Sequence, residues 1–141
     1  MEKLEKLEDF TINVKIKLGA LWTSVTLCYL YGDYFELYVP KKVDELISGD
    51  NLLNSPQNLF LAAVLLAIPA VMVCLSIVLK PRINRFLNIV FGIIFTMIML
   101  LIAATNLEPW RAFYVLLALV ESAITITIIW QAWCWPKKHN L

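Results

Sequence analysis

The sequence predicts an all-α membrane protein, a single domain over residues 1–141 that forms an antiparallel four-helix transmembrane bundle with a short amphipathic helix in its outer loop. Of the 141 residues, 60% are hydrophobic and 16% are charged. Soluble domains have about 45–50% apolar and about 25% charged residues. The mean hydropathy is +0.73, and a core of this size cannot bury that much apolar surface. The net charge of +1 gives no support for a nucleic-acid partner.

Four apolar stretches are long enough to cross, or nearly cross, the hydrocarbon core of a bilayer, which takes about 20 helical residues. They are residues 14–38, 58–79, 86–105 and 111–135. The first stretch is the weakest, because Lys15 and Lys17 precede its apolar part and Asp33 follows it. Lysine side chains can extend their ammonium groups to the interface, so we expect this stretch to span the membrane as well.

Serine and proline explain where the apolar stretches begin and end. Ser55 is expected to cap the second helix, with Pro56 at its first position, where a missing N–H has no consequence. The second helix should end before Pro81, because proline disfavours helix in the preceding residue. The connections 80–85 and 106–110 are short, so we expect the second, third and fourth helices to be antiparallel neighbours.

The loop between the first two stretches contains a short amphipathic segment, residues 41–48. Within it, Val43, Leu46 and Ile47 lie on one helical face. Gly49 follows directly and is typical of the residue that ends a helix. We therefore expect a short helix that lies on the outer membrane surface.

Lysine and arginine counts predict that both termini face the cytoplasm. One side of the membrane would carry nine basic residues and the other side three. The nine are Lys3, Lys6, Lys15, Lys17, Lys80, Arg82, Arg85, Lys137 and Lys138, and the three are Lys41, Lys42 and Arg111. An even number of spans agrees with this orientation. The sequence thus predicts a multi-pass protein of the cell (inner) membrane.

Glu121 is the residue that most needs an explanation. It lies ten positions after Arg111, about 15 Å into the fourth helix and close to the bilayer midplane. A charged carboxylate at that depth is unfavourable, so the side chain should face the bundle interior and be protonated, paired or hydrated. Thr125, Thr96 and Thr26 lie at similar depth and would complete a polar ligand site. The alternative is a carboxyl group that joins helices through hydroxyl hydrogen bonds.

A polar stripe follows one face of the first helix. Trp22, Thr26, Tyr29 and Asp33 are spaced by four, three and four residues, so they share a face. This face would line a cavity that opens outward, and the alternative is an aromatic interfacial belt with a solvated aspartate. Pro69, in the middle of the second stretch, would kink that helix and open a cavity at the midplane, although membrane helices tolerate proline widely.

The sequence contains no pattern that points to an enzyme, a metal site or a cofactor. Cys28, Cys74 and Cys134 are single and widely spaced, so they are interpreted as small buried hydrophobes rather than a redox pair. His139 is the one histidine and lies in the tail. No glycine-rich phosphate loop or serine nucleophile motif occurs. We therefore expect no catalytic residues, no bound metal and no cofactor.

Several segments together resemble a family of small four-helix prokaryotic membrane proteins that is known only as a domain of unknown function. They are residues 21–22, 29–33, 68–73, 82–89 and 129–135, with Pro40, Gly49, Val120, Glu121 and Thr125. The family is distantly similar to the DoxX/DoxD-like membrane proteins, some of which are accessory subunits of oxidoreductase systems that deliver electrons to quinone. The resemblance implies the four-helix architecture and carries over no catalytic residue.

Two functions are consistent with these observations. The first is non-enzymatic binding of a small hydrophobic or weakly polar ligand in the bundle core around Glu121. The alternative is an accessory subunit of a larger membrane complex, such as a quinone-linked oxidoreductase. The expected partners are the lipid bilayer and either another membrane protein or further copies of the chain. The small residues Ala62, Ala63, Ala67 and Ala70 mark one packing face for such a contact.

Overall fold

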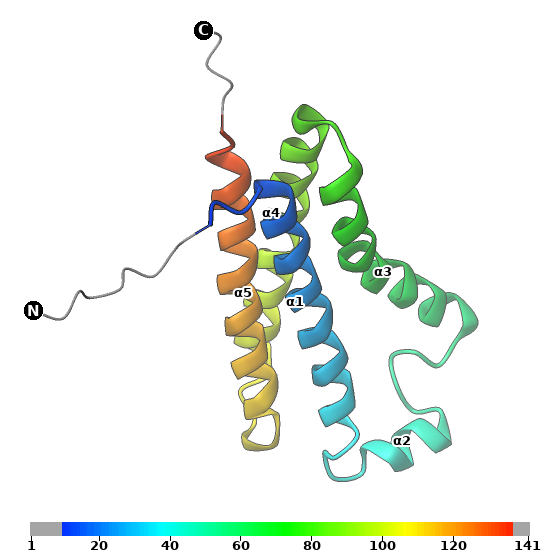
Figure 1. The fold of residues 1–141 in the computed structure, drawn as a ribbon. Helices are drawn as coiled ribbons and strands as arrows, with labels where there is room; N and C mark the ends of the chain where they lie inside the picture. Colours follow the sequence, from blue (N-terminus) through cyan, green and yellow to red (C-terminus); the bar gives the residue numbers. More distant parts are fainter. Residues whose placement is uncertain (1–9, 137–141) are drawn as a thin grey trace, which may run out of the picture.

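The computed structural model describes residues 10–136, and all regular secondary structure in this range is helical, as predicted. The helices are α1 (Val14–Glu36), α2 (Lys42–Ser48), α3 (Pro56–Val78), α4 (Pro81–Thr105) and α5 (Ala112–Trp133), with a 3₁₀ turn at Pro109–Arg111. The four long helices alternate in direction, and α2 lies near one end of them (Figure 1). Four lysines used to predict the orientation lie outside the described residues: Lys3, Lys6, Lys137 and Lys138.

Three helices are long and apolar enough to cross a membrane: α3, α4 and the segment Pro109–Trp133, which contains α5. Many of their large apolar side chains point away from the bundle, and Leu61, Met97 and Leu116 are 62–66% exposed. Lipid accommodates such a surface, whereas water does not. The chain is therefore a multi-pass membrane protein. Helix α1 is less apolar than the other three because tyrosines, threonines and Asp33 interrupt it.

The helix boundaries confirm one predicted signal and correct another. Ser55 Oγ accepts a hydrogen bond from the N–H of Asn58 at 3.2 Å, and Pro56 is the first residue of α3, as expected. Helix α4, however, begins at Pro81, so residues 81–85 form its first turn and are not a loop. Proline suits the first helical position because its φ is already helical and its N–H is not needed there. Pro81 thus ends one helix and starts the next.

The expected amphipathic loop helix is present as α2. It follows Lys41, which has a positive φ of 68°, and ends at Gly49, which has a φ of 77°. None of its residues is buried, and Ile47 is 81% exposed. The bundle therefore does not use the apolar face of α2, which remains available to a membrane surface.

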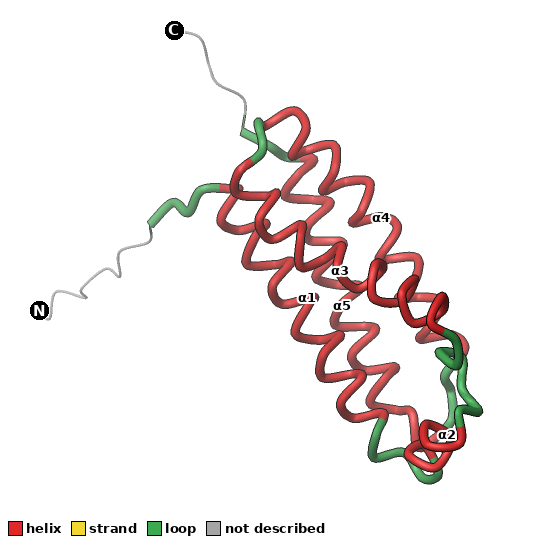
Figure 2. Tube along the Cα trace, turned by 90° about the vertical axis from the view of Figure 1, so that its right-hand side faces the viewer, coloured by secondary structure: helices red, strands yellow, loops and turns green. Residues whose placement is uncertain are grey.

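The packing order of the long helices differs in part from the prediction. Helix α1 packs against α3 and α5, and α4 packs against α5. Helices α4 and α5 are antiparallel neighbours, as expected. Helices α3 and α4 make few contacts although only residues 79–80 join them, so the expectation that they are neighbours along their length is wrong. Figure 2 views the bundle from the side that α3 covers, and Figure 1 shows the first half of α3 leaning away from the other long helices toward the end that carries α2.

The apolar core lies in the half of the bundle nearer to the chain termini. Its centre is Trp22, whose ring meets that of Phe95 edge to face at 5.9 Å between centroids. The other members are fully or almost fully buried: Leu18, Val25, Met72 and Ile128. This core holds α1 against the other three long helices.

A fully buried hydrogen-bond network lies beside this core and was not foreseen from the sequence. Asn88 Oδ1 accepts hydrogen bonds from Trp22 Nε1 at 2.7 Å and from Ser76 Oγ at 3.3 Å. Asn88 Nδ2 donates to Asn84 Oδ1 at 2.7 Å, and Asn84 Nδ2 donates to the Ser76 carbonyl at 2.5 Å. The network joins α1, α3 and α4. Two asparagines four residues apart in an apolar helix are the sequence signal that marks it.

Candidate functional site

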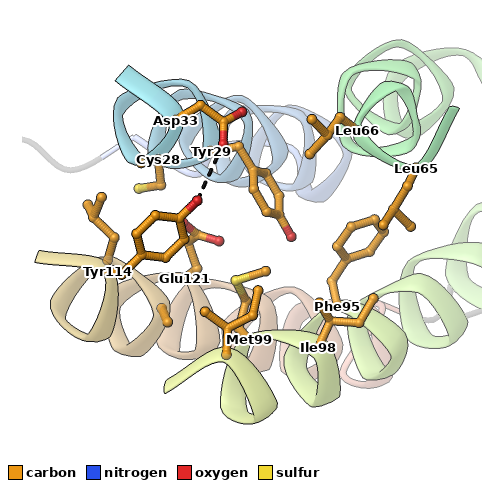
Figure 3. A pocket seen from close by; sticks show the side chains of 14 residues that line it. Cys28, Tyr29, Asp33, Leu65, Leu66, Phe95, Ile98, Met99, Tyr114 and Glu121 are labelled. Atoms are coloured by element: carbon orange, nitrogen blue, oxygen red, sulfur yellow. Dashed lines mark hydrogen bonds between the residues drawn. The ribbon is translucent and has the colours of Figure 1, made fainter. Parts of the chain in front are cut away.

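A cavity of about 160 Å³ lies in the other half of the bundle, toward α2. All four long helices line it, through the second half of α1, the first half of α3, the second half of α4 and the first half of α5. Its wall is mainly apolar, with Leu65 and Leu66 on one side and Phe95, Ile98 and Met99 on another (Figure 3). The polar groups that reach it come from α1 and α5.

The course of α3 explains why this half of the bundle is hollow. Pro69 is buried in the middle of α3. Proline cannot donate a hydrogen bond to the carbonyl of Leu65 and its ring clashes there, which bends a helix. The first half of α3 leans away from the other helices (Figure 1). Leu65 and Leu66 therefore remain 41% and 37% exposed and form a loose wall instead of filling the space.

Glu121 is the deepest polar group of the cavity. It is only 3% exposed, and its Oε2 atom is buried without a hydrogen-bond partner among the described residues. The carboxyl group points into the space enclosed by Tyr29, Met99 and Tyr114 (Figure 3). None of the described residues that line the cavity is a lysine, arginine or histidine. A buried carboxyl oxygen without a partner is rare in proteins, so it calls for an explanation.

Tyr29 and Asp33 reach the same cavity from α1. The ring of Tyr29 meets that of Phe95 at 6.1 Å, and its hydroxyl is also buried without a partner among the described residues. Asp33 lies one helical turn farther toward α2 and accepts a hydrogen bond from the Tyr114 hydroxyl at 3.4 Å. The structure therefore brings together Tyr29, Asp33 and Glu121. Tyr114 was not singled out from the sequence, where an aromatic residue near a span end is typical of an interfacial anchor.

The three threonines assigned to the same site from the sequence lie outside the cavity lining. Thr96 Oγ1 and Thr125 Oγ1 are 2.7 Å apart and link α4 to α5. Thr125 also donates to the Glu121 carbonyl at 2.9 Å. Thr26 donates to the Trp22 carbonyl of its own helix at 2.9 Å. The structure thus places these hydroxyls in contacts within and between helices. Pro69 does not line the cavity either, and it affects the cavity through the bend of α3.

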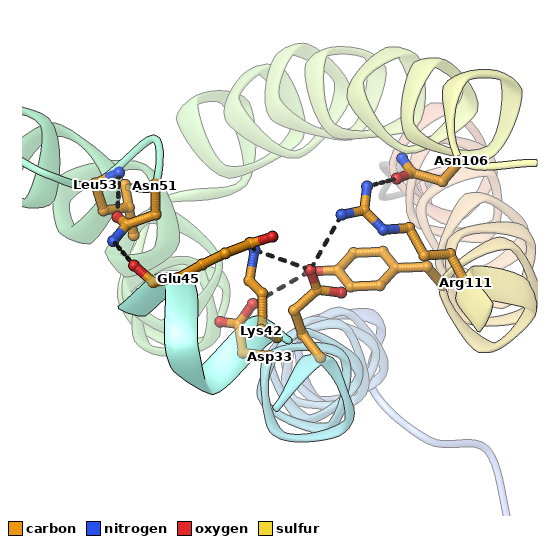
Figure 4. A network of polar contacts seen from close by, with 9 residues as sticks. Asp33, Lys42, Glu45, Asn51, Leu53, Asn106 and Arg111 are labelled. Atoms are coloured by element: carbon orange, nitrogen blue, oxygen red, sulfur yellow. Dashed lines mark hydrogen bonds and ion pairs between the residues drawn. The ribbon is translucent and has the colours of Figure 1, made fainter. Parts of the chain in front are cut away.

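A polar network joins the helix ends on the α2 side of the cavity (Figure 4). Glu36 Oε1 lies 3.2 Å from Lys42 Nζ and 3.5 Å from Arg111 Nη2. Arg111 Nη1 donates to Asn106 Oδ1 at 2.9 Å. The network therefore ties α1 to α2 and to the connection between α4 and α5. In the sequence, Arg111 contributes only to the prediction of the membrane orientation. Its contact with Glu36 could not be predicted, because the two residues are 75 positions apart.

Comparisons with known proteins give a family but no function. A family of unknown function matches residues 5–141. No curated protein matches the chain, and no solved structure matches it. The predicted membership in a family of unknown function is therefore confirmed, and any functional conclusion has to come from the cavity itself.

Proposed function

The chain belongs to the DUF6326 family of unknown function, and we propose that it binds a small, mainly apolar molecule in the cavity around Glu121 without converting it chemically. One observation carries this proposal. Glu121 Oε2 and the Tyr29 hydroxyl are both buried without partners among the described residues, and both belong to one cavity of about 160 Å³. Unpartnered buried polar groups are unfavourable. A ligand with one or two polar atoms would satisfy both.

The cavity volume and lining define the size class of the ligand. An engineered apolar cavity of about 150 Å³ in another protein binds benzene. A cavity of about 160 Å³ with leucine, isoleucine, methionine and phenylalanine walls therefore suits one ring or a short branched chain. The polar end of the ligand would lie toward Glu121 and Tyr29. Ordered water would also satisfy these groups, so a test has to distinguish a bound ligand from bound water.

Non-enzymatic binding fits the chemistry of the lining. All three cysteines are free, and Cys28 is the one that lines the cavity. Cys74 and Cys134 are exposed, so the expectation that the three are buried is wrong. A thiol–quinone enzyme requires a reactive cysteine pair. Titration should accordingly find three independent thiols in the folded protein.

We expect a neutral single-ring compound, benzyl alcohol, to protect Cys28 from alkylation by N-ethylmaleimide. Cys28 is half-buried and lines the cavity, so an occupant should block access to its sulfur. The measurement uses the full chain carrying Cys74→Ser and Cys134→Ser, and follows alkylation by intact mass. Ala118→Leu should abolish protection, because Ala118 is a buried residue of the cavity wall and the added carbons would occupy the space.

The matched control keeps Cys74 as the single thiol, through Cys28→Ser and Cys134→Ser. Cys74 is exposed on α3, so benzyl alcohol should not slow its alkylation. Equal protection of both thiols would mean a general effect on the membrane or detergent. No protection of Cys28 at any soluble concentration, by benzyl alcohol or by a charged single-ring compound of the same size, would leave water as the occupant and overturn the ligand proposal.

For the topology, we propose that α1 is a fourth span and that both termini are cytoplasmic. Helix α1 has the length of a span and packs between α3 and α5. Lys15 Nζ donates to the Ile77 carbonyl at 3.1 Å, near the end of α3, which is where a lysine can reach the interface. The half of the bundle that contains the cavity would then face the outside of the cell.

This topology predicts the labelling of two cysteines by a maleimide that cannot cross membranes. In a variant with Cys28→Ser, Cys74→Ser and Lys41→Cys, the new thiol next to α2 should react in intact cells. Cys134, just after α5, should react only after the cells are opened. The reverse labelling pattern would mean that the protein has the opposite orientation. Reaction of both thiols in intact cells would mean that the two sites lie on the same side and that the chain does not cross the membrane four times.

The alternative function is an accessory subunit of a larger membrane complex. It is favoured by α3, where Ala63, Ala67 and Ala70 are exposed and not packed within the bundle. Small residues on a lipid-facing surface allow close approach of another helix. The distant similarity to DoxX/DoxD-like proteins that is expected from the sequence would imply the same role, although no curated protein or solved structure matches the chain. Gentle purification from native membranes followed by intact mass measurement decides between the two: a second polypeptide at fixed stoichiometry would favour the accessory subunit.

A further inference from the structure

We infer that the cavity selects a small lipophilic amine in its protonated form, whose ammonium group binds the Glu121 carboxylate while its apolar body fills the space toward Phe95 and Met99. This inference rests on the proposed function and narrows it to one class of ligand. It follows from the charges around the cavity, from the aromatic lining and from the volume.

The charges of the cavity are unbalanced. Glu121 and Asp33 both belong to the lining, and none of the described lining residues is basic. The basic residues on the α2 side of the cavity, Lys42 and Arg111, are paired with Glu36. The side chain of Glu36 is only 15% exposed, so these pairs are partly shielded from solvent. The cavity therefore retains two carboxyl groups with no cation of their own.

The unpartnered oxygen argues for a cationic ligand over a neutral or anionic one. Glu121 Oε2 is an acceptor when the group is ionised, and its buried position makes a positive partner the strongest stabilising group available. A neutral ligand would leave that charge uncompensated, or would require the carboxyl group to keep its proton. An anion would be repelled by both Glu121 and Asp33.

The aromatic residues around the carboxyl group fit the same chemistry. Tyr29, Phe95 and Tyr114 line the cavity together with Glu121, and Figure 3 shows the two tyrosine rings beside the carboxyl group. The faces of aromatic rings attract ammonium groups, and more so where water is excluded. Asp33 lies nearer to α2 and is exposed, so it would attract a cation that enters from that end.

The test compares three single-ring compounds of similar size: benzylamine, which is positively charged at pH 7, neutral benzyl alcohol and anionic benzoate. The readout is protection of Cys28 from N-ethylmaleimide in the full chain with Cys74→Ser and Cys134→Ser, in nanodiscs of zwitterionic lipid. We expect benzylamine to protect at a concentration at least about tenfold lower than benzyl alcohol, as is typical of a hydrogen bond to a charged group. Benzoate should give no protection.

Two substitutions locate the preference. Glu121→Gln should weaken protection by benzylamine about tenfold or more. It should weaken protection by benzyl alcohol less, because the glutamine amide can still bond a hydroxyl group but carries no charge. Glu108→Gln is the matched control, because Glu108 is an exposed carboxylate near the same end of the bundle and should change neither value. Asp33→Asn should produce a smaller loss than Glu121→Gln, since Asp33 is exposed.

The outcomes separate this inference from the proposed function. Equal or stronger protection by benzyl alcohol would overturn the amine inference and leave the ligand-binding proposal standing. Failure of all three compounds would overturn both. If the folded Glu121→Gln variant still prefers benzylamine, the preference does not come from Glu121. If that variant does not fold, the comparison of the three compounds on the unchanged cavity still decides whether a cation is preferred.

Discussion

Asn88→Ala is expected to lower the free energy of unfolding by about 2–4 kcal/mol. The Asn88 amide accepts from Trp22 Nε1 and Ser76 Oγ and donates to Asn84, and all four side chains are fully buried. Removal of the amide leaves several buried polar groups without partners, each of which is unfavourable by about 1–3 kcal/mol before relaxation. The measurement is reversible unfolding of the purified protein in mixed micelles, or its thermal midpoint.

Asn58→Ala is the matched control for this prediction. Asn58 Nδ2 donates to the Leu52 carbonyl at 3.1 Å, in an exposed position near the start of α3. Water can replace this contact, so we expect a change of less than about 0.5 kcal/mol. Comparable losses for both variants would mean that the buried network contributes no more than a surface hydrogen bond. The same result would remove the explanation for how α1, α3 and α4 are held together.

Gly92→Ala should destabilise the protein by about 1–3 kcal/mol, because α4 and α5 approach each other too closely for a side chain at this position. A Cβ atom at Gly92 would lie 2.7 Å from Ile129 Cγ1 and 3.5 Å from the Thr125 carbonyl oxygen. The clash acts against the higher helix propensity of alanine, which favours the variant by about 1 kcal/mol. Adding Ile129→Ala should recover part of the lost stability, which a double-mutant cycle measures.

Gly19→Ala is the matched control for Gly92→Ala. A Cβ atom at Gly19 would lie 3.4 Å from Ile77 Cγ1, an ordinary contact. We expect this variant to be neutral or stabilising by up to about 1 kcal/mol. If both substitutions had the same effect, close approach of α4 and α5 at Gly92 would not determine stability. A Gly92→Ala loss that Ile129→Ala fails to reduce would point to the same conclusion.

The cavity and the buried network divide the bundle into two unlike halves. The half near the termini has a filled apolar core and a satisfied hydrogen-bond network around Asn88. The half near α2 has Glu121 and Tyr29 with unpartnered atoms and a helix, α3, that leans away. A well-packed half beside a half with a cavity is an arrangement that suits a binding site, because the packing that holds the helices together lies where no ligand has to enter.

The sequence by itself determined the class of the protein and most of its helices. Local signals determine the helices: long apolar stretches, the Ser55 cap and the prolines at positions 56 and 81. Each signal depends on residues within about one helix length, so it can be interpreted without knowing how the helices pack. The same local reasoning singled out Glu121, Tyr29 and Asp33, because a carboxyl group inside an apolar helix and a four-residue polar spacing are visible in the sequence. The start of α4 was misplaced because Pro81 carries a stop signal and a start signal at once.

The tertiary structure alone decided how the helices pack and which polar groups meet. Trp22 and Asn88 are 66 residues apart, and Tyr114 and Asp33 are 81 residues apart. The rotation of each helix sets such pairs, and helices that are apolar on nearly all sides do not specify their rotation because lipid solvates every face equally well. For the same reason, only the structure shows that Thr96 and Thr125 join α4 to α5 and that α3 leaves a cavity beside Glu121.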